Sequence, residues 1–596
     1  MIQEILQELI EEITVWLQAA GVDNPVVQLD RAASPDFGEY STNVAMRYAK
    51  QLDKKPFELA EELAAFLHNK QINSLSKVEA MNPGFVNLHL AAVVKVRHLE
   101  SILGAEDSFG SNQALKGEKW VIEHTSPNPN KAMHLGHLRN NLVGMGIVRL
   151  LKMSGADVTS DAVYNNRGIA IAKVMYGYLA HMKKDDSTPT DIDYWVEHKT
   201  EWFTPIEKEM KPDVFVTECY ILGEQDNTAN QDVEKEIRQM VVDWETGNQA
   251  VLNLWEVVLE FAYEGIDRTL NRLGNSWDKI WYEHEHYQQG KKYVETGLEK
   301  EVFQTLDDGA ILTNLESDYD LSDTVLLKND GTSLYITQDL ALTDLKKKTY
   351  NADKLVWVIG PDQSLALKQL FAVCEQLGIG NRDDFTHVAY GYVGLKDEDG
   401  GFKKMSSRAG TVVLIDDVID EVKASIRERF DEDERHDEST REALSEKLAI
   451  AAVKFSFLRS DRNQDLSFDI KQSVDVHGDS GMYVMYSFVR TQSILRKGSG
   501  SSTVVSVPSE LGEEASLVRS MVYFDEVVKK STDDLSVHHV AQYLLEVSSL
   551  FNSWYAKETI LDGGEQEGYK LAIVKAAGIV LKNGMAILGI DTVDEI

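Results

Sequence analysis

The sequence predicts an α/β protein whose central domain is a Rossmann-like parallel sheet, with an α+β domain before it and an all-α domain after it. Residues 119–123 form a short apolar run typical of a buried strand, and residues 156–159 have the pattern of a second strand. Between them, leucine, isoleucine and valine residues recur at helical spacing as far as Gly155. Strand, helix and strand in this order make the βαβ unit of a parallel sheet.

The N-terminal part, residues 1–112, is predicted to be a separate α+β domain. Amphipathic patterns cover residues 2–17 and 56–67, and residues 82–90 alternate like a strand after a turn. The chain has 596 residues, which is enough for two to four domains. No run of about eighteen apolar residues occurs, so the sequence predicts no membrane span.

Composition limits the classes of function. The cysteines are Cys219 and Cys374 alone, which favours a reducing cytoplasm and excludes a zinc–cysteine cluster. The formal net charge is −36, yet nucleic-acid binding needs a local basic surface rather than a basic total. Acidic runs such as residues 431–434 are interpreted as solvated faces.

The loop between the first strand and the helix carries the candidate chemistry. His134 and His137 stand where residues 126–139 turn from loop to helix, and a helix N-terminus favours phosphate. Gly136 has no side chain, so a flat ligand can lie against the backbone there. The two histidines have three interpretations: metal ligands, core residues or phosphate-binding donors. No Cys, Asp or Glu follows at zinc-finger or HExxH spacing, which disfavours a metal.

A second stretch decides between these interpretations. Residues 401–413 read Gly-Phe-Lys-Lys-Met-Ser-Ser-Arg-Ala-Gly-Thr-Val-Val and resemble the signature loop with which class I aminoacyl-tRNA synthetases close over ATP. The His-Leu-Gly-His sequence at 134–137 resembles the other signature of that class. Together, in this order and separated by a large insertion, they indicate a class I enzyme.

The flanking residues resemble the arginyl-tRNA synthetases in particular. The resemblance rests on Glu123, Ser126-Pro127-Asn128 and Lys131, on residues 330–341, and on residues 358–363, and it extends over nearly the whole chain. It implies that L-arginine is activated with ATP to arginyl-adenylate and transferred to the 3′ end of tRNA(Arg), releasing AMP and pyrophosphate. It also implies a cytoplasmic monomer, with Mg²⁺ accompanying ATP and no structural metal.

Two rival functions belong to other classes. A tRNA-independent adenylating ligase is disfavoured by the long helical C-terminal region. A non-catalytic RNA-binding or regulatory paralogue is disfavoured because His134, Gly136, His137 and Lys404 are intact.

The resemblance assigns the phosphate chemistry residue by residue. His134 and His137 would hold the phosphates in the transition state. Ser407 stands where many class I enzymes have a second lysine. By resemblance Lys131 is the first candidate to compensate, and Arg408 and Lys403 are the alternatives. Lys404 is the remaining catalytic cation of the loop. The ATP-binding set is Gly136, Lys403, Met405 and Ser406.

The resemblance also implies an arginine pocket. Asp339 and Tyr335 would read the guanidinium, which a carboxylate can bind bidentately. Glu123 and Gln363 would line the pocket, and Ser126 and Asn128 would hold the α-amino and α-carboxyl groups. A pocket of fixed hydrogen bonds can reject lysine on binding alone, so no editing domain is expected.

The remaining segments complete the domain plan. Residues 113–425 are predicted to form the catalytic domain, interrupted by a connective insertion at about 180–320, with strands resuming at 324–327 and 355–360. In the loop after the second strand the family often has an aspartate. Here Asn166 stands nearby instead, which argues against a direct substrate role for this loop.

Residues 426–596 are predicted to form the helical anticodon-binding domain. Within residues 483–497 aromatic and cationic residues alternate, a composition suited to stacking bases and holding phosphates. An ordinary amphipathic core helix is the competing interpretation. The predicted tRNA-binding residues are Tyr483, Tyr486, Arg490 and Arg496.

Overall fold

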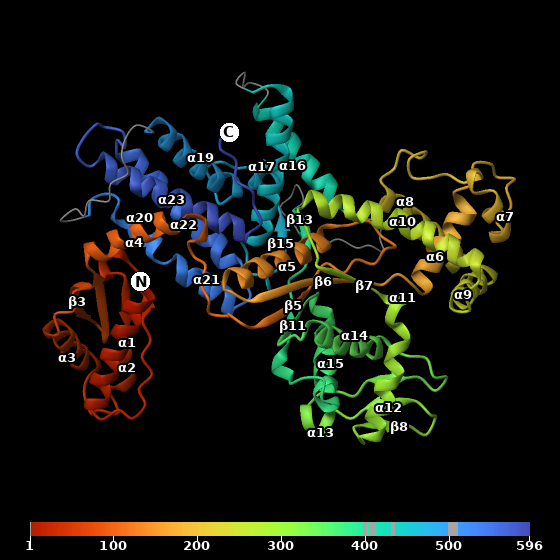
Figure 1. Cartoon of the computed structure of the whole chain (residues 1–596), viewed down its shortest axis with the longest axis horizontal. Helices are drawn as coiled ribbons and strands as arrows, with labels where there is room; N and C mark the ends of the chain where they lie inside the picture. The colour runs from red at the N-terminus through yellow and green to blue at the C-terminus, as the bar shows by residue number, and fades with distance from the viewer. Residues whose placement is uncertain (1, 397–401, 405–412, 431–435, 499–510) are drawn as a thin grey trace.

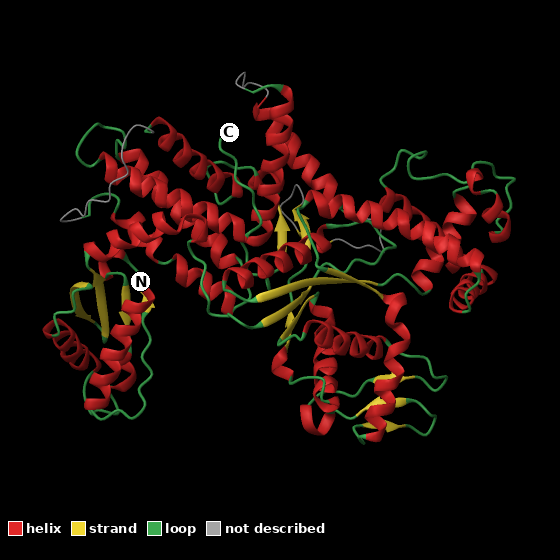
Figure 2. Ribbon diagram, viewed as in Figure 1, coloured by secondary structure: helices red, strands yellow, loops and turns green. Residues whose placement is uncertain are grey.

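The computed structural model describes residues 2–396, 402–404, 413–430, 436–498 and 511–596. An N-terminal domain and a C-terminal helical domain lie on one side of the central sheet, and a helical insertion extends from the other side (Figure 1). Helices make up most of the protein outside that sheet (Figure 2).

The N-terminal domain is a four-stranded antiparallel sheet in the order β1-β2-β4-β3, with helices packed against it. The first helix buries five apolar residues at three- and four-residue spacing, as its amphipathic pattern predicts. The elements are α1 (Ile2–Ala19), β1 (Asp30–Arg31), β2 (Tyr40–Thr42), α2 (Val44–Tyr48), α3 (Pro56–Asn69), β3 (Leu75–Met81), β4 (Phe85–Leu90) and the connecting α4 (Ala92–Ala105). The helices predicted at 2–17 and 56–67 and the strand predicted within 82–90 are therefore confirmed.

The central sheet has five parallel strands in the order β12-β11-β5-β6-β7. Its elements are β5 (Lys119–Glu123), α5 (Leu135–Met153), β6 (Asp157–Tyr164), β7 (Lys279–Tyr282), α14 (Tyr335–Tyr350), β11 (Lys354–Val358), α15 (Ser364–Leu377) and β12 (Phe385–Val388). The chain moves from β5 to β6 on one side and returns as β11 on the other. The carboxyl ends of β5 and β11 therefore form the switch point at which open α/β sheets bind ligands.

Two insertions interrupt this sheet. The first is a helical unit with its own hydrophobic core, made of α6 (Ile169–His181), α7 (Ile192–Glu197), α8 (Pro212–Ala229), α9 (Gln231–Glu245) and α10 (Gln249–Arg272). The second contains a small antiparallel sheet and consists of α11 (Glu283–His286), α12 (Lys291–Glu299), β8 (Phe303–Thr305), β9 (Ile311–Thr313), α13 (Glu316–Tyr319) and β10 (Val325–Leu327).

Both insertions differ in detail from the sequence prediction. Strand β7 belongs to the parallel sheet but falls inside the range 180–320 predicted as one insertion. It has only four residues, and an apolar run of that length does not distinguish a strand from a short piece of buried helix. The strand predicted at 324–327 exists as β10, but it pairs with β9 in the antiparallel sheet instead of the parallel one. Pairing partners depend on tertiary contacts, which the pattern of a three-residue strand does not encode.

After the central sheet the chain forms a second small sheet, whose strand β13 contacts α5, and then continues as helices. The sheet has the order β14-β13-β15 and consists of β13 (Val393–Lys396), β14 (Phe402–Lys404) and β15 (Leu466–Phe468). The helices are α16 (Ile415–Phe430), α17 (Glu438–Leu458), α18 (Ile470–Ser473), α19 (Gly481–Lys497), α20 (Ala515–Val522), α21 (Phe524–Asp533), α22 (His538–Lys557) and α23 (Glu567–Ile587). One hydrophobic core continues from the N-terminal domain through α5 into these helices. In the described part of the chain, every helix is too short or too polar to cross a bilayer.

Candidate active site

His134 and His137 lie at the N-terminus of α5 with their rings stacked, 3.8 Å apart between centroids. Nδ1 of His134 accepts a hydrogen bond from the backbone N–H of Gly136 at 3.1 Å. The backbone N–H of His134 donates in turn to Nδ1 of His137 at 3.2 Å. Because both Nδ1 atoms accept, each neutral ring carries its proton on Nε2 and presents an N–H donor there.

Both imidazoles are neutral at physiological pH. Burial lowers the pKa of His134 to about 4, and the positive charge of Lys131 adds to the effect. Burial also lowers the pKa of His137 well below its usual value, with His134 and Lys131 contributing. The site therefore combines two neutral N–H donors with the positive end of a helix, which favours the phosphate interpretation. Among the described residues, no group of three or more His, Cys, Asp or Glu side chains has the arrangement of a metal site.

The end of the second signature lies directly against the first. Backbone hydrogen bonds of 3.2 and 3.3 Å join residues 413–415 to residues 133–135, and Leu414 forms an antiparallel bridge with His134. Val413 is the last residue of the signature segment and residues 414–415 follow it, so the fold brings together two motifs that are far apart in the sequence.

The predicted loop residues themselves are described only in part. Lys403 and Lys404 are in β14, whose backbone pairs antiparallel with β13. Strand β13 in turn contacts α5, the helix that carries the histidines. Met405 and Ser406 lie outside the described residues.

Lys131 lies close to both histidines, since its charge contributes to the lowering of their pKa values. Its ammonium nitrogen is 5.4 Å from the ring centroid of Tyr220 on α8. The fold therefore keeps a cation beside the two histidine N–H donors, although Ser407 stands at the place of the second lysine of the loop.

A buried lysine that sequence reasoning missed lies beneath the predicted arginine pocket. Lys346 Nζ is 2.8 Å from Glu123 Oε2 and 2.8 Å from Asp161 Oδ1, and its side chain is 1% exposed. Trp281 Nε1 donates to the other oxygen of Asp161 at 2.8 Å. Lys346 follows Asp339 by two helical turns on α14, so the two residues share one face of the helix. This spacing is the feature of the sequence from which a lysine near the pocket could have been predicted.

Asp339 is a carboxyl group of the predicted pocket with a raised pKa. Its side chain reaches solvent but is closely surrounded by protein, and this desolvation raises its pKa to about 7. The negative charges of Glu123 and Glu283 act in the same direction, and Lys346 opposes them. The structure thus brings Asp339 and Glu123 to one site, from α14 and the end of β5.

The other predicted pocket residues are at the carboxyl ends of the strands or at the start of α14. Ser126 Oγ donates to Glu123 Oε1 at 3.3 Å. Asn128 is exposed, as is Gln363, which follows β11. Tyr335, the first residue of α14, is 80% exposed. Three of these four side chains are therefore accessible to a ligand.

Asn166 has contacts that explain its presence without a substrate. It is 1% exposed, and its amide nitrogen donates to the hydroxyl of Tyr263 on α10 at 3.0 Å. The backbone N–H of His284 donates to its Oδ1 at 3.2 Å. Asn166 thus fixes the loop after β6 to both insertions, in agreement with the argument against a direct substrate role.

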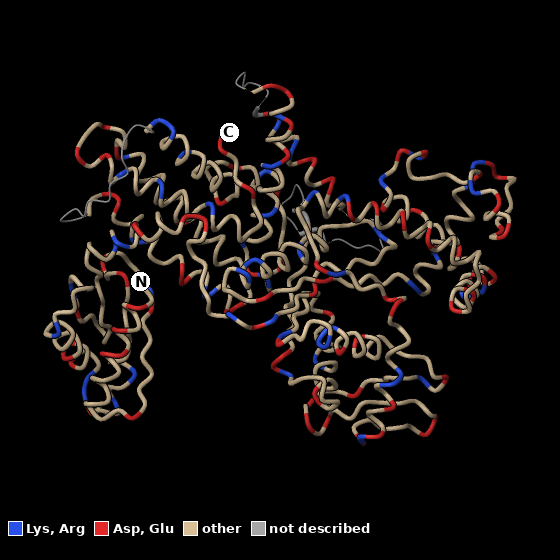
Figure 3. The backbone as a smooth tube through the Cα atoms, in the orientation of Figure 1, with Lys and Arg blue, Asp and Glu red and all other residues tan. Residues whose placement is uncertain are grey.

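The predicted tRNA-binding residues on α19 differ in accessibility. Tyr486 and Arg490 are exposed one turn apart, and the Arg490 guanidinium lies 5.1 Å from the ring centroid of Tyr555 on α22. Tyr483 is half-buried. Arg496 donates to the backbone carbonyl of Asp594 at 3.0 Å. Lysine and arginine are interspersed with aspartate and glutamate in every domain (Figure 3), so the overall negative charge leaves room for local basic surfaces.

Three family models match consecutive parts of the chain. They are described as "Arginyl tRNA synthetase N terminal domain" (residues 1–90), "tRNA synthetases class I (R), catalytic domain" (98–470) and "DALR anticodon binding domain" (484–596). The catalytic match includes the histidines, the signature segment and the residues of the predicted arginine pocket.

Similar proteins of known name agree with these matches. The arginine–tRNA ligase of Treponema denticola is 31% identical, over 94% of this chain and 93% of that protein. That of Bacteroides fragilis is 30% identical, over 99% of this chain and 100% of that protein. The solved arginyl-tRNA synthetase of Thermus thermophilus has a TM-score of 0.79 at 21% identity, covering 99% of this chain and 100% of that one. At this identity, the structural similarity supports the fold alone.

Proposed function

The chain belongs to the arginyl-tRNA synthetase family of class I and is an ATP-dependent arginine–tRNA ligase; from this premise we propose which of its residues carry out the reaction. Arginine, ATP and tRNA are its substrates. In the first step a carboxylate oxygen of arginine attacks the α-phosphorus of ATP, and the bond to pyrophosphate breaks. In the second step a ribose hydroxyl of the tRNA takes the arginyl group and AMP leaves.

The first step is assigned to the N-terminus of α5. Displacement at phosphorus needs positioning and charge stabilisation more than covalent help. The Nε2–H groups of His134 and His137 donate to phosphate oxygens as charge develops on them. Lys131 and Lys404 supply positive charge for the same phosphates. Mg²⁺ enters with ATP as a counter-charge for its phosphates.

The observation that carries this assignment is the backbone pairing of residues 413–415 with residues 133–135. This pairing supports a single site because the end of the signature segment lies next to the histidine motif. Gly136 leaves room for the nucleotide, with Lys403, Met405 and Ser406 completing the ATP-binding set.

The arginine pocket is assigned to the carboxyl ends of the strands. Asp339 and Tyr335 bind the guanidinium, with Glu123 and Gln363 beside them, and Ser126 and Asn128 bind the α-amino and α-carboxyl groups. Lys346 holds Glu123 by an ion pair from below, so Glu123 presents a fixed acceptor. A fixed pair of carboxylates matches the planar donors of a guanidinium better than the single ammonium of lysine.

The tRNA contacts are assigned to the two outer domains. The exposed pair Tyr486 and Arg490, next to Tyr555, offers a ring and a cation on one surface, with Tyr483 and Arg496 at its margins. Residues 1–112 and 426–596 form the two tRNA-contacting domains around the catalytic domain of residues 113–425. We propose further that the enzyme is a cytoplasmic monomer, which agrees with two buried free thiols, Cys219 and Cys374.

The test is pyrophosphate exchange with arginine and ATP, measured with and without tRNA(Arg). Exchange that requires tRNA supports a synthetase whose site is completed by the bound RNA. Exchange without tRNA retains adenylation but leaves a small-molecule acceptor open, which charging of tRNA(Arg) then decides. Absence of exchange under both conditions, with folded protein, would refute the assignment of His134 and His137.

A further inference from the structure

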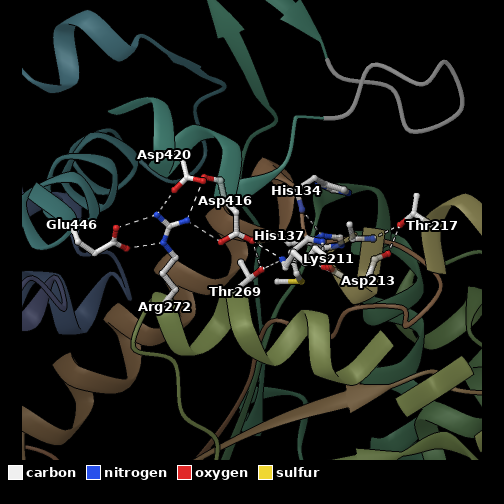
Figure 4. A network of polar contacts seen from close by, with 12 residues as sticks. His134, His137, Lys211, Asp213, Thr217, Thr269, Arg272, Asp416, Asp420 and Glu446 are labelled. Atoms are coloured by element: carbon white, nitrogen blue, oxygen red, sulfur yellow. Dashed lines mark hydrogen bonds and ion pairs between the residues drawn. The ribbon is translucent and has the colours of Figure 1, made fainter. Parts of the chain in front are cut away.

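An ionic cluster connects the helical insertion with both signature segments (Figure 4). Lys211 directly precedes α8, and its ammonium lies 2.5 Å from Asp416 Oδ2 and 3.3 Å from Asp213 Oδ2. It also hydrogen-bonds the hydroxyl of Thr269 on α10. One cation from the insertion therefore meets two carboxylates that belong to different segments of the chain.

The first carboxylate holds the segment that leads to His134. Asp213 is 1% exposed, and its Oδ2 accepts from the backbone N–H of Met133 at 3.4 Å. One turn further along α8, the hydroxyl of Thr217 accepts from the backbone N–H of Ala132 at 2.7 Å. The start of α8 thus fixes the backbone immediately before the histidine.

The second carboxylate holds the segment that leaves the signature loop. Asp416 directly follows Ile415, whose N–H donates to the carbonyl of Met133 at 3.2 Å. On the other side, Arg272 Nη1 donates to Asp416 Oδ1 at 3.1 Å, and the hydroxyl of Thr269 donates to Oδ2 at 2.6 Å. Burial alone would raise the pKa of Asp416, but the hydrogen bonds from Lys211 and Thr269 outweigh it and the pKa is lowered.

Arg272 extends the cluster into the helices after the loop. Its Nε donates to Glu446 on α17 at 2.7 Å, and its Nη2 donates to Asp420 on α16 at 2.5 Å. The end of α10 is therefore attached both to the first turns of α16 and to α17. Movement of the insertion relative to these helices would break several charged contacts at once.

We propose that Lys211 is a positioning residue, which sets the register of residues 413–415 on residues 133–135 by binding Asp213 and Asp416 together. In this role the helical insertion fixes the distance between the two signature motifs. The proposal rests on the proposed roles of His134 and Lys404. The cluster contains none of the residues proposed to bind arginine. Breaking the cluster therefore slows adenylate formation and leaves the arginine KM unchanged.

An ion cluster of this kind could instead serve folding only, and buried ion pairs contribute little net stability. The matched control is Lys173 on α6, which pairs with Glu224 on α8 inside the insertion and forms no ion pair with the described residues of either signature. Its side chain is 14% exposed, against 24% for Lys211. Lys173→Met and Lys211→Met each remove one partly buried ammonium and keep the aliphatic stem.

The experiment measures kcat and the arginine KM of pyrophosphate exchange, with tRNA present, for the full chain. Lys211→Met is expected to lower kcat by roughly tenfold to a hundredfold, the cost of displacing reacting groups by about 1 Å. Its arginine KM stays within about twofold of wild type, and Lys173→Met changes neither constant by more than that. Asp416→Asn lowers kcat in the same way. Because Asp416 also binds Arg272, the double variant is compared with Asp416→Asn and loses no more than about twofold beyond it, since that change already breaks the Lys211 linkage.

Three results would overturn the proposal: unchanged kcat in Lys211→Met and Asp416→Asn, equal losses in Lys173→Met, or additive losses in the double variant. If Lys211→Met fails to fold, Asp416→Asn decides by the same criteria, since its amide keeps the hydrogen bond from Thr269. If the wild-type enzyme shows no exchange, the proposed roles of the histidines fail. If the wild-type enzyme is active and the variants behave as in the three results above, the Lys211 linkage alone fails.

Discussion

If Asp339 binds the guanidinium as proposed, arginine binding should strengthen as the pH rises through about 7, because a guanidinium pairs with the ionised carboxylate. Desolvation raises the pKa of this carboxyl group to about 7, and the charges of Glu123 and Glu283 add to the effect, while Lys346 opposes it. At pH 6 roughly a tenth of Asp339 is then ionised, against roughly nine-tenths at pH 8. The dissociation constant of arginine should therefore be about tenfold higher at pH 6 than at pH 8, or about 1.3 kcal/mol.

Isothermal titration calorimetry of arginine at several pH values measures this directly, since binding alone avoids pH effects on the chemical step. Buffers of different ionisation enthalpy should also reveal proton release on binding near pH 6. The matched variant is Asp339→Asn, which should bind arginine more weakly by about 2–5 kcal/mol at pH 8 and show little pH dependence. An affinity in the wild-type protein that is flat between pH 6 and pH 8 would refute the reasoning.

The same pKa shift has an opposite consequence for stability. A carboxyl group whose folded-state pKa is raised stabilises the fold fully below its unfolded pKa, and this contribution is lost as the pH rises through the folded pKa. For Asp339 the loss lies between about pH 4 and pH 7. Above pH 7, Asp339→Asn should therefore melt at a higher temperature than wild type although it has lost function. A lower melting temperature would show that the carboxylate is well solvated or well paired in the empty pocket.

Three further predictions concern other parts of the enzyme. His134→Asn should lower kcat of pyrophosphate exchange by about a hundredfold or more with little change in melting temperature, since one transition-state donor is lost; a loss below about threefold would exclude that role. Lys346→Met should lower the free energy of unfolding by about 3–5 kcal/mol in urea titrations, because two buried carboxylates lose their partner, and an unchanged midpoint would contradict the buried ion pair. Tyr486→Ala should weaken tRNA(Arg) binding by about 1–3 kcal/mol in filter-binding titrations while an alanine substitution of the exposed Arg238 on α9 has no effect; equal effects of both substitutions would remove the α19 surface from the tRNA interface.

Local pattern was sufficient for the elements that bury one continuous apolar face. The helices at residues 2–17 and 56–67 and strands β5 and β11 were predicted where they occur, because their periodicity reports which side chains leave water. Strand β7 was missed and β10 was predicted in the wrong sheet, since strands of three or four residues take their partners from tertiary contacts. The buried Lys346 was missed for a related reason: a lysine in a helix is normally at the surface, and only the fold brings Glu123 and Asp161 around it.

The sequence by itself determined the class of the enzyme, because the histidine motif at residues 134–137, the segment at residues 401–413 and their flanking residues resemble a single family, and the family models and relatives match it. The roles of Asp339 and Lys404 stay predictions that follow from this resemblance. The tertiary structure alone decided how these parts relate. It brought residues 413–415 to His134, placed a buried lysine beneath the arginine pocket, and joined the insertion to both signatures through Lys211. The physical reason is that hydrogen bonds and ion pairs between distant segments depend on positions in space, which local periodicity does not carry.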